Sequence, residues 1–123
     1  MNAKTSWIQA DLVRVHLLIS VTTQGREDHD FWTTSYLISY GDDGVTWTTI
    51  PTLYSANFDR NTKVTNQLPS DTFGRFVRLR PQDFSEGVGI RWDVRGILKE
   101  GREITNARKY ICCSLTVKIG TLL

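Results

Sequence analysis

Apolar residues recur along much of the chain with a period of two, which is the spacing of a β-strand with one buried face. The pattern is clearest over residues 15–22, where Val15, Leu17, Ile19 and Val21 share one face. Residues 33–40 repeat it, with Tyr36, Ile38 and Tyr40 on one side. We therefore expect two strands here, the first with a fully apolar face.

Further strand-like runs lie at residues 7–12, 45–50, 63–68, 75–80 and 90–95. Gly41-Asp-Asp-Gly44 predicts a hairpin turn, because glycine accepts the positive φ that such a turn requires. Pro69 and Pro81 should end the strands that precede them. No helical three-four pattern occurs before residue 97, so the spacing of short strands and turns favours an all-β antiparallel sandwich or barrel.

The length of 123 residues suits one domain with a core of its own. The net charge of +2 is unevenly distributed. Residues 1–97 contain 10 Lys and Arg against 11 Asp and Glu, a balance of −1, whereas residues 98–123 contain 5 against 2, a balance of +3. The body therefore lacks the clustered cations of a nucleic-acid-binding face, and we expect no nucleic-acid partner.

Catalytic and redox signatures are missing from the sequence. There is no Gly-x-Ser-x-Gly elbow, no phosphate-binding glycine loop and no His-Glu-x-x-His. Cys112 and Cys113 are adjacent, which suits neither a disulfide framework nor metal-ligand spacing. The first residues lack an apolar signal-peptide core, so we expect either an intracellular protein or a fragment without its start. We predict no catalytic residues and no enzyme activity.

The segment between the strands at 15–22 and 33–40 concentrates charge that would be costly to bury. Its candidate ligand-binding residues are Gln24, Arg26, Glu27, Asp28, His29, Asp30 and Phe31. An exposed Phe31 beside Arg26 suits stacking on a sugar face or insertion among lipid headgroups. His29 can change its charge between about pH 5 and 8. Solvation and local packing are the simpler roles for all of these side chains.

The same loop raises the option of a calcium site, because closely spaced carboxylates suit a hard cation. The spacing of Glu27, Asp28 and Asp30 matches no EF-hand loop, and acids in a surface loop are usually solvated. We therefore predict no metal site and no cofactor, with calcium as the weaker alternative.

Several segments, in order from Trp7 to Gly96, closely resemble the successive blocks of a discoidin domain, also called the coagulation factor five/eight type C domain. They are Trp7-Ile-Gln-Ala-Asp-Leu12, Val21-Thr-Thr-Gln-Gly-Arg26, Ser35 to Trp47, Gly74-Arg-Phe-Val-Arg-Leu-Arg-Pro81 and Gly89-Ile-Arg-Trp-Asp-Val-Arg-Gly96. The resemblance implies an antiparallel jelly-roll β-sandwich of the galactose-binding-like type. It also implies an extracellular module, secreted or on the cell surface, that binds ligands through loops called spikes.

The chain departs from the family pattern at both ends. The opening strands and the most prominent apolar spike are absent, so the resemblance implies a sandwich incomplete at its N-terminus, spanning residues 1–97. Residues 98–123 form a tail outside the resemblance. Because Leu115, Val117 and Ile119 alternate, we expect a strand there that covers surface left open by the missing part.

The resemblance implies a recognition or adhesion module, in which loop 24–31 is one of the spikes. A cell-surface glycan or a matrix protein is the favoured partner, and neighbouring domains of a larger protein are expected. Anionic phospholipid is the alternative, opposed by the acids of the loop. A structural piece with no ligand of its own is the third interpretation.

Outside the loop, structural roles are expected. Trp7, Trp47 and Trp92 should belong to the core, and Arg78 and Arg91 should form ion pairs within the sandwich. His16, which alternates with apolar neighbours, should be a buried structural histidine.

Overall fold

The computed structural model describes residues 6–87, 89–99, 110–112 and 116–121. They form nine strands: β1 Ser6–Gln24, β2 Trp32–Gly41, β3 Thr48–Thr49, β4 Tyr54–Ser55, β5 Val64–Gln67, β6 Phe73–Ser85, β7 Arg91–Leu98, β8 Tyr110–Cys112 and β9 Thr116–Thr121. The strands pair antiparallel throughout these residues, which confirms the predicted all-β antiparallel class. Within these residues no helix is long and apolar enough to cross a membrane.

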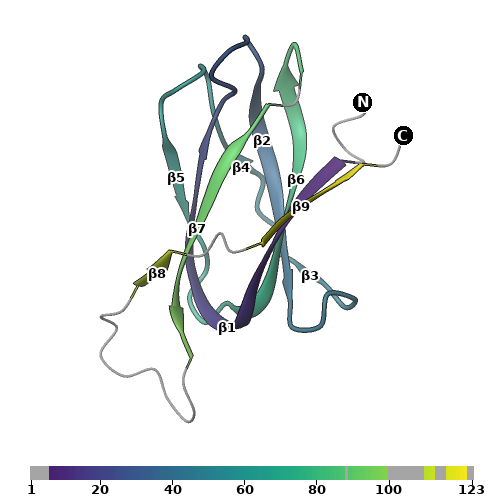
Figure 1. The fold of residues 1–123 in the computed structure, drawn as a ribbon, viewed down its shortest axis with the longest axis vertical. Helices are drawn as coiled ribbons and strands as arrows, with labels where there is room; N and C mark the ends of the chain where they lie inside the picture. The colour runs from purple at the N-terminus through teal and green to yellow at the C-terminus, as the bar shows by residue number, and fades with distance from the viewer. Residues whose placement is uncertain (1–5, 88, 100–109, 113–115, 122–123) are drawn as a thin grey trace.

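The long strand β1 joins the two halves of the fold. Its first half, Ser6–Asp11, pairs with β6 and β9, whereas its second half pairs with β7 and β5 and, at His16 and Leu17, with the start of β6. The strand turns sharply between these halves, at the bottom of Figure 1, where Val13 has a φ of 70°. This bend folds a single hydrogen-bonded network with the order β3-β2-β6-β1-β7-β8 over onto itself.

The hydrophobic core fills the space inside this curled sheet. Its fully buried members come from both halves of β1 and from β2, β6 and β7: Leu12, Leu18, Val21, Tyr36, Ile38, Val77, Leu79 and Val94. Burial raises the pKa of Tyr36 to about 12, and the hydroxyl accepts a 3.0 Å hydrogen bond from Asn66 Nδ2. His16 is buried as expected, with Nδ1 2.7 Å from the carbonyl oxygen of Arg14.

The prediction that Val15, Leu17, Ile19 and Val21 share one buried face of residues 15–22 is wrong. Leu18 and Val21 are buried in the core, whereas Leu17 and Ile19 are partly exposed. A register irregularity between Leu18 and Ser20 separates the two sets. A bulge adds one residue to one strand, so the side chains that follow it change faces. Strict alternation over this stretch therefore misassigned the residues before the bulge.

Strand β6 does not end at Pro81 as predicted. It continues to Ser85, and Pro81 is itself buried and paired with Tyr36 of β2. The pairing of β6 with β1 on its other side goes no further than Leu79. The missing N–H of Pro81 therefore costs no hydrogen bond with β1, and irregularities in β2 beside Ser35 accommodate the ring.

The expectation that Trp7 and Trp47 belong to the core is also wrong. Val77 and Leu79 face the core, so Arg78 between them faces outwards. Its guanidinium carbon lies 4.0 Å from the centre of the Trp7 ring and 4.2 Å from that of Trp47. The two half-buried indoles thus enclose a cation on the outer face, and Arg78 stacks where an ion pair was predicted.

Two strands of the tail extend the sheet. Strand β9 pairs with Ser6–Asp11 of β1, and β8 pairs with β7 through Arg95, Gly96 and Ile97. The expected tail strand is therefore present. Residues 8–11 of β1 have a paired neighbour on both sides, β6 and β9, so β9 covers an edge of β1.

Replacing Val13 with glycine should stabilise the protein. A β-branched residue is strained at positive φ, which glycine adopts freely, and we expect a gain of about 1 kcal/mol in the free energy of unfolding. Val45→Gly is the matched control, because Val45 is also exposed to solvent but has no positive φ. Chemical denaturation that shows V13G to be less stable than the natural protein would contradict the strained bend.

Deletion of residues 104–123 removes both tail strands and should lower the free energy of unfolding by about 1–3 kcal/mol, since the β1 edge loses its partner. Thermal denaturation followed by circular dichroism measures the change. Deletion of residues 122–123 alone is the control. An unchanged melting temperature after the longer deletion would show that the tail does not stabilise the sheet.

Candidate binding site

Three loops meet at the end of the fold opposite the bend, at the top of Figure 1. They are residues 25–31 between β1 and β2, residues 56–63 between β4 and β5, and residues 86–90 between β6 and β7. We call them together the loop cluster. The strands that carry them are paired in the sheet, so the loop bases are held in a defined arrangement.

Arg91, the first residue of β7, connects two of these loops. Its Nε donates to the carbonyl oxygen of Gly25 at 2.8 Å, and its Nη2 donates to the carbonyl oxygen of Arg60 and to Asn61 Oδ1, both at 2.9 Å. The expected role of Arg91 in an ion pair is secondary, because its Nη1 lies 4.0 Å from Glu27 Oε2. The guanidinium mainly binds backbone carbonyl groups and thereby fixes the loops.

The close approach of the first two loops requires a glycine at position 25. A Cβ there would overlap the carbonyl oxygen of Asp59 and lie 2.9 Å from the Cβ of Trp32. Gln24 reinforces the contact, because its Nε2 donates a 2.7 Å hydrogen bond to the carbonyl oxygen of Asn61. The predicted site residue Gln24 is therefore a link between loops.

The charged tip of loop 25–31 is organised around Asp28. The backbone N–H of Arg26 donates to the carbonyl oxygen of Phe31 at 2.8 Å, which closes the loop. Asp28 Oδ1 lies 3.2 Å from His29 Nδ1 and accepts a 2.7 Å hydrogen bond from Arg26 Nε. These contacts, that of His29 first, lower the pKa of Asp28 to about 2. All three side chains are exposed and can contact a ligand.

Phe31 lies at the base of this tip and is half-buried. A Cβ on Gly87 would come within 2.9 Å of its ring, so the loop at 86–90 packs directly against it. The ring centre lies 5.6 Å from the guanidinium carbon of Arg26 and 5.5 Å from the ring centre of His29. Phe31 therefore joins two loops and carries the exposed side chains of the first.

Each carboxylate of loop 25–31 lies beside a different arginine side chain. Asp30 Oδ1 accepts from Arg60 Nε at 2.8 Å, Asp28 is bound by Arg26, and Glu27 lies beside Arg91. In the part of the chain that the structure describes, no group of three or more His, Cys, Asp or Glu is placed to hold a metal ion. The geometry favours ion pairing within the loop cluster over the calcium alternative.

The second loop is a part of the candidate site that sequence reasoning missed, because residues 51–61 lack a clean period. Asp59 Oδ1 accepts hydrogen bonds from the backbone N–H groups of Asn61 and Thr62, and its Oδ2 accepts from the Thr62 hydroxyl. Asn57 Nδ2 donates to the carbonyl oxygens of Thr23 and Thr62. The sequence 57–61, Asn-Phe-Asp-Arg-Asn, carried the signal in its turn-forming residues beside one aromatic.

Two phenylalanines near the loops are exposed to solvent. Phe58 in the second loop is 65% exposed, and Phe84 near the end of β6 is 39% exposed. A single exposed apolar side chain is ordinary on a protein surface, but an aromatic ring beside hydrogen-bonding groups is the combination found in ligand sites. The loop cluster therefore combines an exposed aromatic at Phe58 with hydrogen-bonding groups at Arg26, His29 and Arg60.

Comparison with known proteins gives a consistent result. The sequence profile of the F5/8 type C domain matches residues 1–94. Discoidin-2 of Dictyostelium discoideum is 33% identical over 93 residues, which are 74% of this chain and 36% of that protein. Bovine lactadherin is 30% identical over 104 residues, which are 77% of this chain and 24% of lactadherin.

The wild-type discoidin II structure from Dictyostelium discoideum matches with a TM-score of 0.73 and 31% identity, over 78% of this chain and 38% of that one. The likeness confirms the discoidin β-sandwich fold. The chain spans about a quarter to two fifths of the length of these relatives. Members of the matched family are binding modules without enzyme activity, which confirms for residues 1–94 the prediction of no enzyme activity. The chain belongs to the F5/8 type C, or discoidin, domain family.

Proposed function

We propose that this protein is an extracellular recognition module that binds a glycan on a cell surface or in the matrix through the loop cluster. The observation that carries the proposal is the fixed arrangement of loops 25–31 and 56–63 on Arg91. Loops that are already ordered lose little entropy when a ligand binds. The extracellular location and the neighbouring domains of a larger protein are parts of the same proposal, and rest on the family.

The chemistry of the exposed side chains supports a glycan. Sugars present hydroxyl groups at their edges and apolar C–H groups on their faces, so their sites combine hydrogen-bonding side chains with an aromatic surface. Arg26 and His29 supply donors, and Glu27 supplies an exposed carboxylate acceptor. Phe58 supplies an aromatic ring that is 65% exposed. A matrix protein with a polar epitope would use the same groups.

Anionic phospholipid is the second candidate, because Phe58 and Phe84 could insert among lipid chains. The negative charge of the first loop disfavours binding to anionic phospholipid. Residues 24–31 contain one arginine and three carboxylates, a balance of −2 with His29 neutral. A negative loop is repelled by an anionic membrane surface, which instead attracts clusters of Lys and Arg.

Replacing Arg26, His29 and Phe31 together with alanine should reduce binding at least tenfold, because the donors and the base of the loop are removed. A glycan array and a sedimentation assay with phosphatidylserine liposomes, run on one sample, measure the two candidate ligands. Binding to sugars alone supports the proposal, and sedimentation with liposomes supports the second candidate. No binding in either assay would indicate a structural role.

The double variant R26A/H29A is needed beside the triple one, since Phe31 packs against Gly87 and its loss can disturb the neighbouring loop. Arg14→Ala is the matched control, because Arg14 is exposed beside the bend, at the opposite end of the fold. Glycan binding retained by both loop variants would move the site away from loop 25–31.

The pKa of the Asp28 carboxyl group should be about 2, below the ordinary value near 4, because His29 and then Arg26 stabilise its charged form. The stabilisation of the loop by this carboxylate is present above about pH 4 and is lost as the pH falls through about 2. Carbon-detected NMR titration measures the midpoint. In R26A/H29A the midpoint should rise towards the ordinary value; an unchanged midpoint would show that these residues do not hold Asp28.

A further inference from the structure

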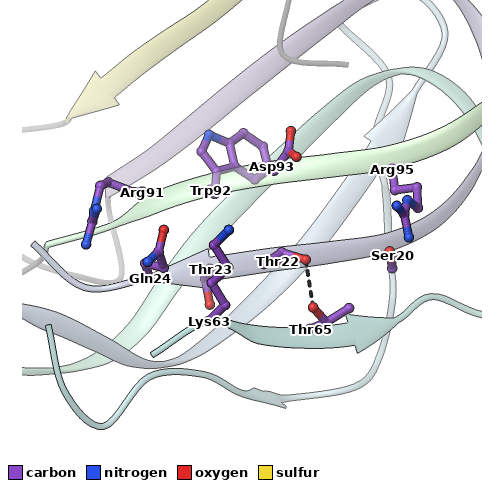
Figure 2. A pocket seen from close by; sticks show the side chains of 10 residues that line it. All are labelled: Ser20, Thr22, Thr23, Gln24, Lys63, Thr65, Arg91, Trp92, Asp93 and Arg95. Atoms are coloured by element: carbon purple, nitrogen blue, oxygen red, sulfur yellow. Dashed lines mark hydrogen bonds between the residues drawn. The ribbon is translucent and has the colours of Figure 1, made fainter. Parts of the chain in front are cut away.

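A groove with a volume of about 420 Å³ lies on the three-stranded part of the sheet, apart from the tips of the loop cluster. Figure 2 shows that its lining side chains come from β1, from β7 and from the start of β5. This volume is within the range of about 300–1,000 Å³ that is typical of small-ligand sites. Neither the sequence patterns nor the function proposed for the loops accounts for this groove.

The strand register explains why the lining is polar. Thr22 lies between Thr65 of β5 and Asp93 of β7, and Ser20 pairs with Arg95 in the same way. Because side chains alternate between faces, these residues share the face opposite to Val21 and Val94 of the core. The hydroxyl groups of Thr22 and Thr65 lie 2.8 Å apart, as drawn in Figure 2. The floor of the groove therefore carries hydroxyl groups.

Cations lie towards both ends of this floor. Val64 pairs with Thr23, so Lys63 lies alongside Gln24, which pairs with Arg91. Arg95 is four residues further along β7, a separation of about 13 Å at ~3.3 Å per residue. Three cations and the single carboxylate of Asp93 give the lining a balance of +2. Residues 1–97, whose net charge is −1, thus form a locally positive surface at this groove.

We propose that this groove binds a sulfated polysaccharide, with the sulfate groups at Lys63 and Arg95 and the sugar rings over the hydroxyl floor. Two cationic positions about 13 Å apart suit a chain of several rings better than a single small anion. The groove reaches Gln24 and Arg91 at the base of the loop cluster. A polysaccharide can therefore follow the sheet without using the loop tips.

The lining disfavours single-stranded nucleic acid, the other abundant polyanion. Non-specific binding of that kind relies on aromatic rings on which bases stack. Trp92 is the one aromatic residue of the described lining, and it packs against the hydrophobic core. Hydroxyl groups on the floor match the hydroxyl groups of a glycan instead.

The test is calorimetric titration with a heparin-derived octasaccharide, at low and at physiological salt. The double variant K63Q/R95Q should lose at least about tenfold in affinity and show a weaker salt dependence, because two charge-assisted contacts are removed. Asp93→Asn should bind more tightly than the natural protein, because it removes the opposing carboxylate. All three positions are exposed, so these changes should leave the fold intact.

Controls separate this site from general charge and from the loops. Arg14→Gln removes an exposed cation beside the bend and should leave the octasaccharide affinity within twofold. R26A/H29A should also leave it unchanged, whatever the loops bind. The proposal is overturned if K63Q/R95Q binds as well as the natural protein, or if R14Q loses as much affinity. It is equally overturned if a desulfated octasaccharide or a DNA octamer binds as tightly.

Discussion

The bend of β1 at Val13 is the constraint on which the rest of the structure depends. One strand has to pair with β6 and β9 before the bend and with β7, β5 and the start of β6 after it. Leu12 and Val21, from the two halves, then meet in the same core. The positive φ of Val13 is a local cost that the surrounding pairs compensate. Because the second half of β1 ends at Gln24, the bend also determines where the first loop of the candidate site begins.

Arg91 transmits this order from the sheet to the loop cluster. Its position is set by pairing with Gln24, and its guanidinium binds the carbonyl groups of Gly25 and Arg60. Ion pairs within the loops then satisfy most of their charge, so the recognition that we propose would rest on the few remaining exposed groups, Phe58 among them. Strand β7, which carries Arg91, also contributes Arg95 to the groove on the sheet. One face of β7 thus supports both of the surfaces that we propose for recognition.

The sequence predicted those features that depend on residues close together in the chain. The strand at 32–41, the positive φ of Gly44 and the exposed charged loop follow from alternation, glycine and charge, whereas the strand predicted at 45–50 is only Thr48–Thr49. The phase of β1 could not be predicted, because the bulge between Leu18 and Ser20 is a property of the pairing with β7. The outward stacking of Arg78 on Trp7 and Trp47 and the role of loop 56–63 also depend on partners distant in sequence. Side-chain type alone does not reveal such partners.

Native-state hydrogen exchange of β1 tests most directly whether one bent strand holds the fold and its loops together. The account predicts that amides in residues 8–11 and in residues 20–23 exchange with the same free energy, equal to that of global unfolding. The tip of loop 25–31 should exchange faster than either. If the two halves of β1 differed by more than about 1 kcal/mol, they would open independently. That result would contradict a single scaffold centred on the bend.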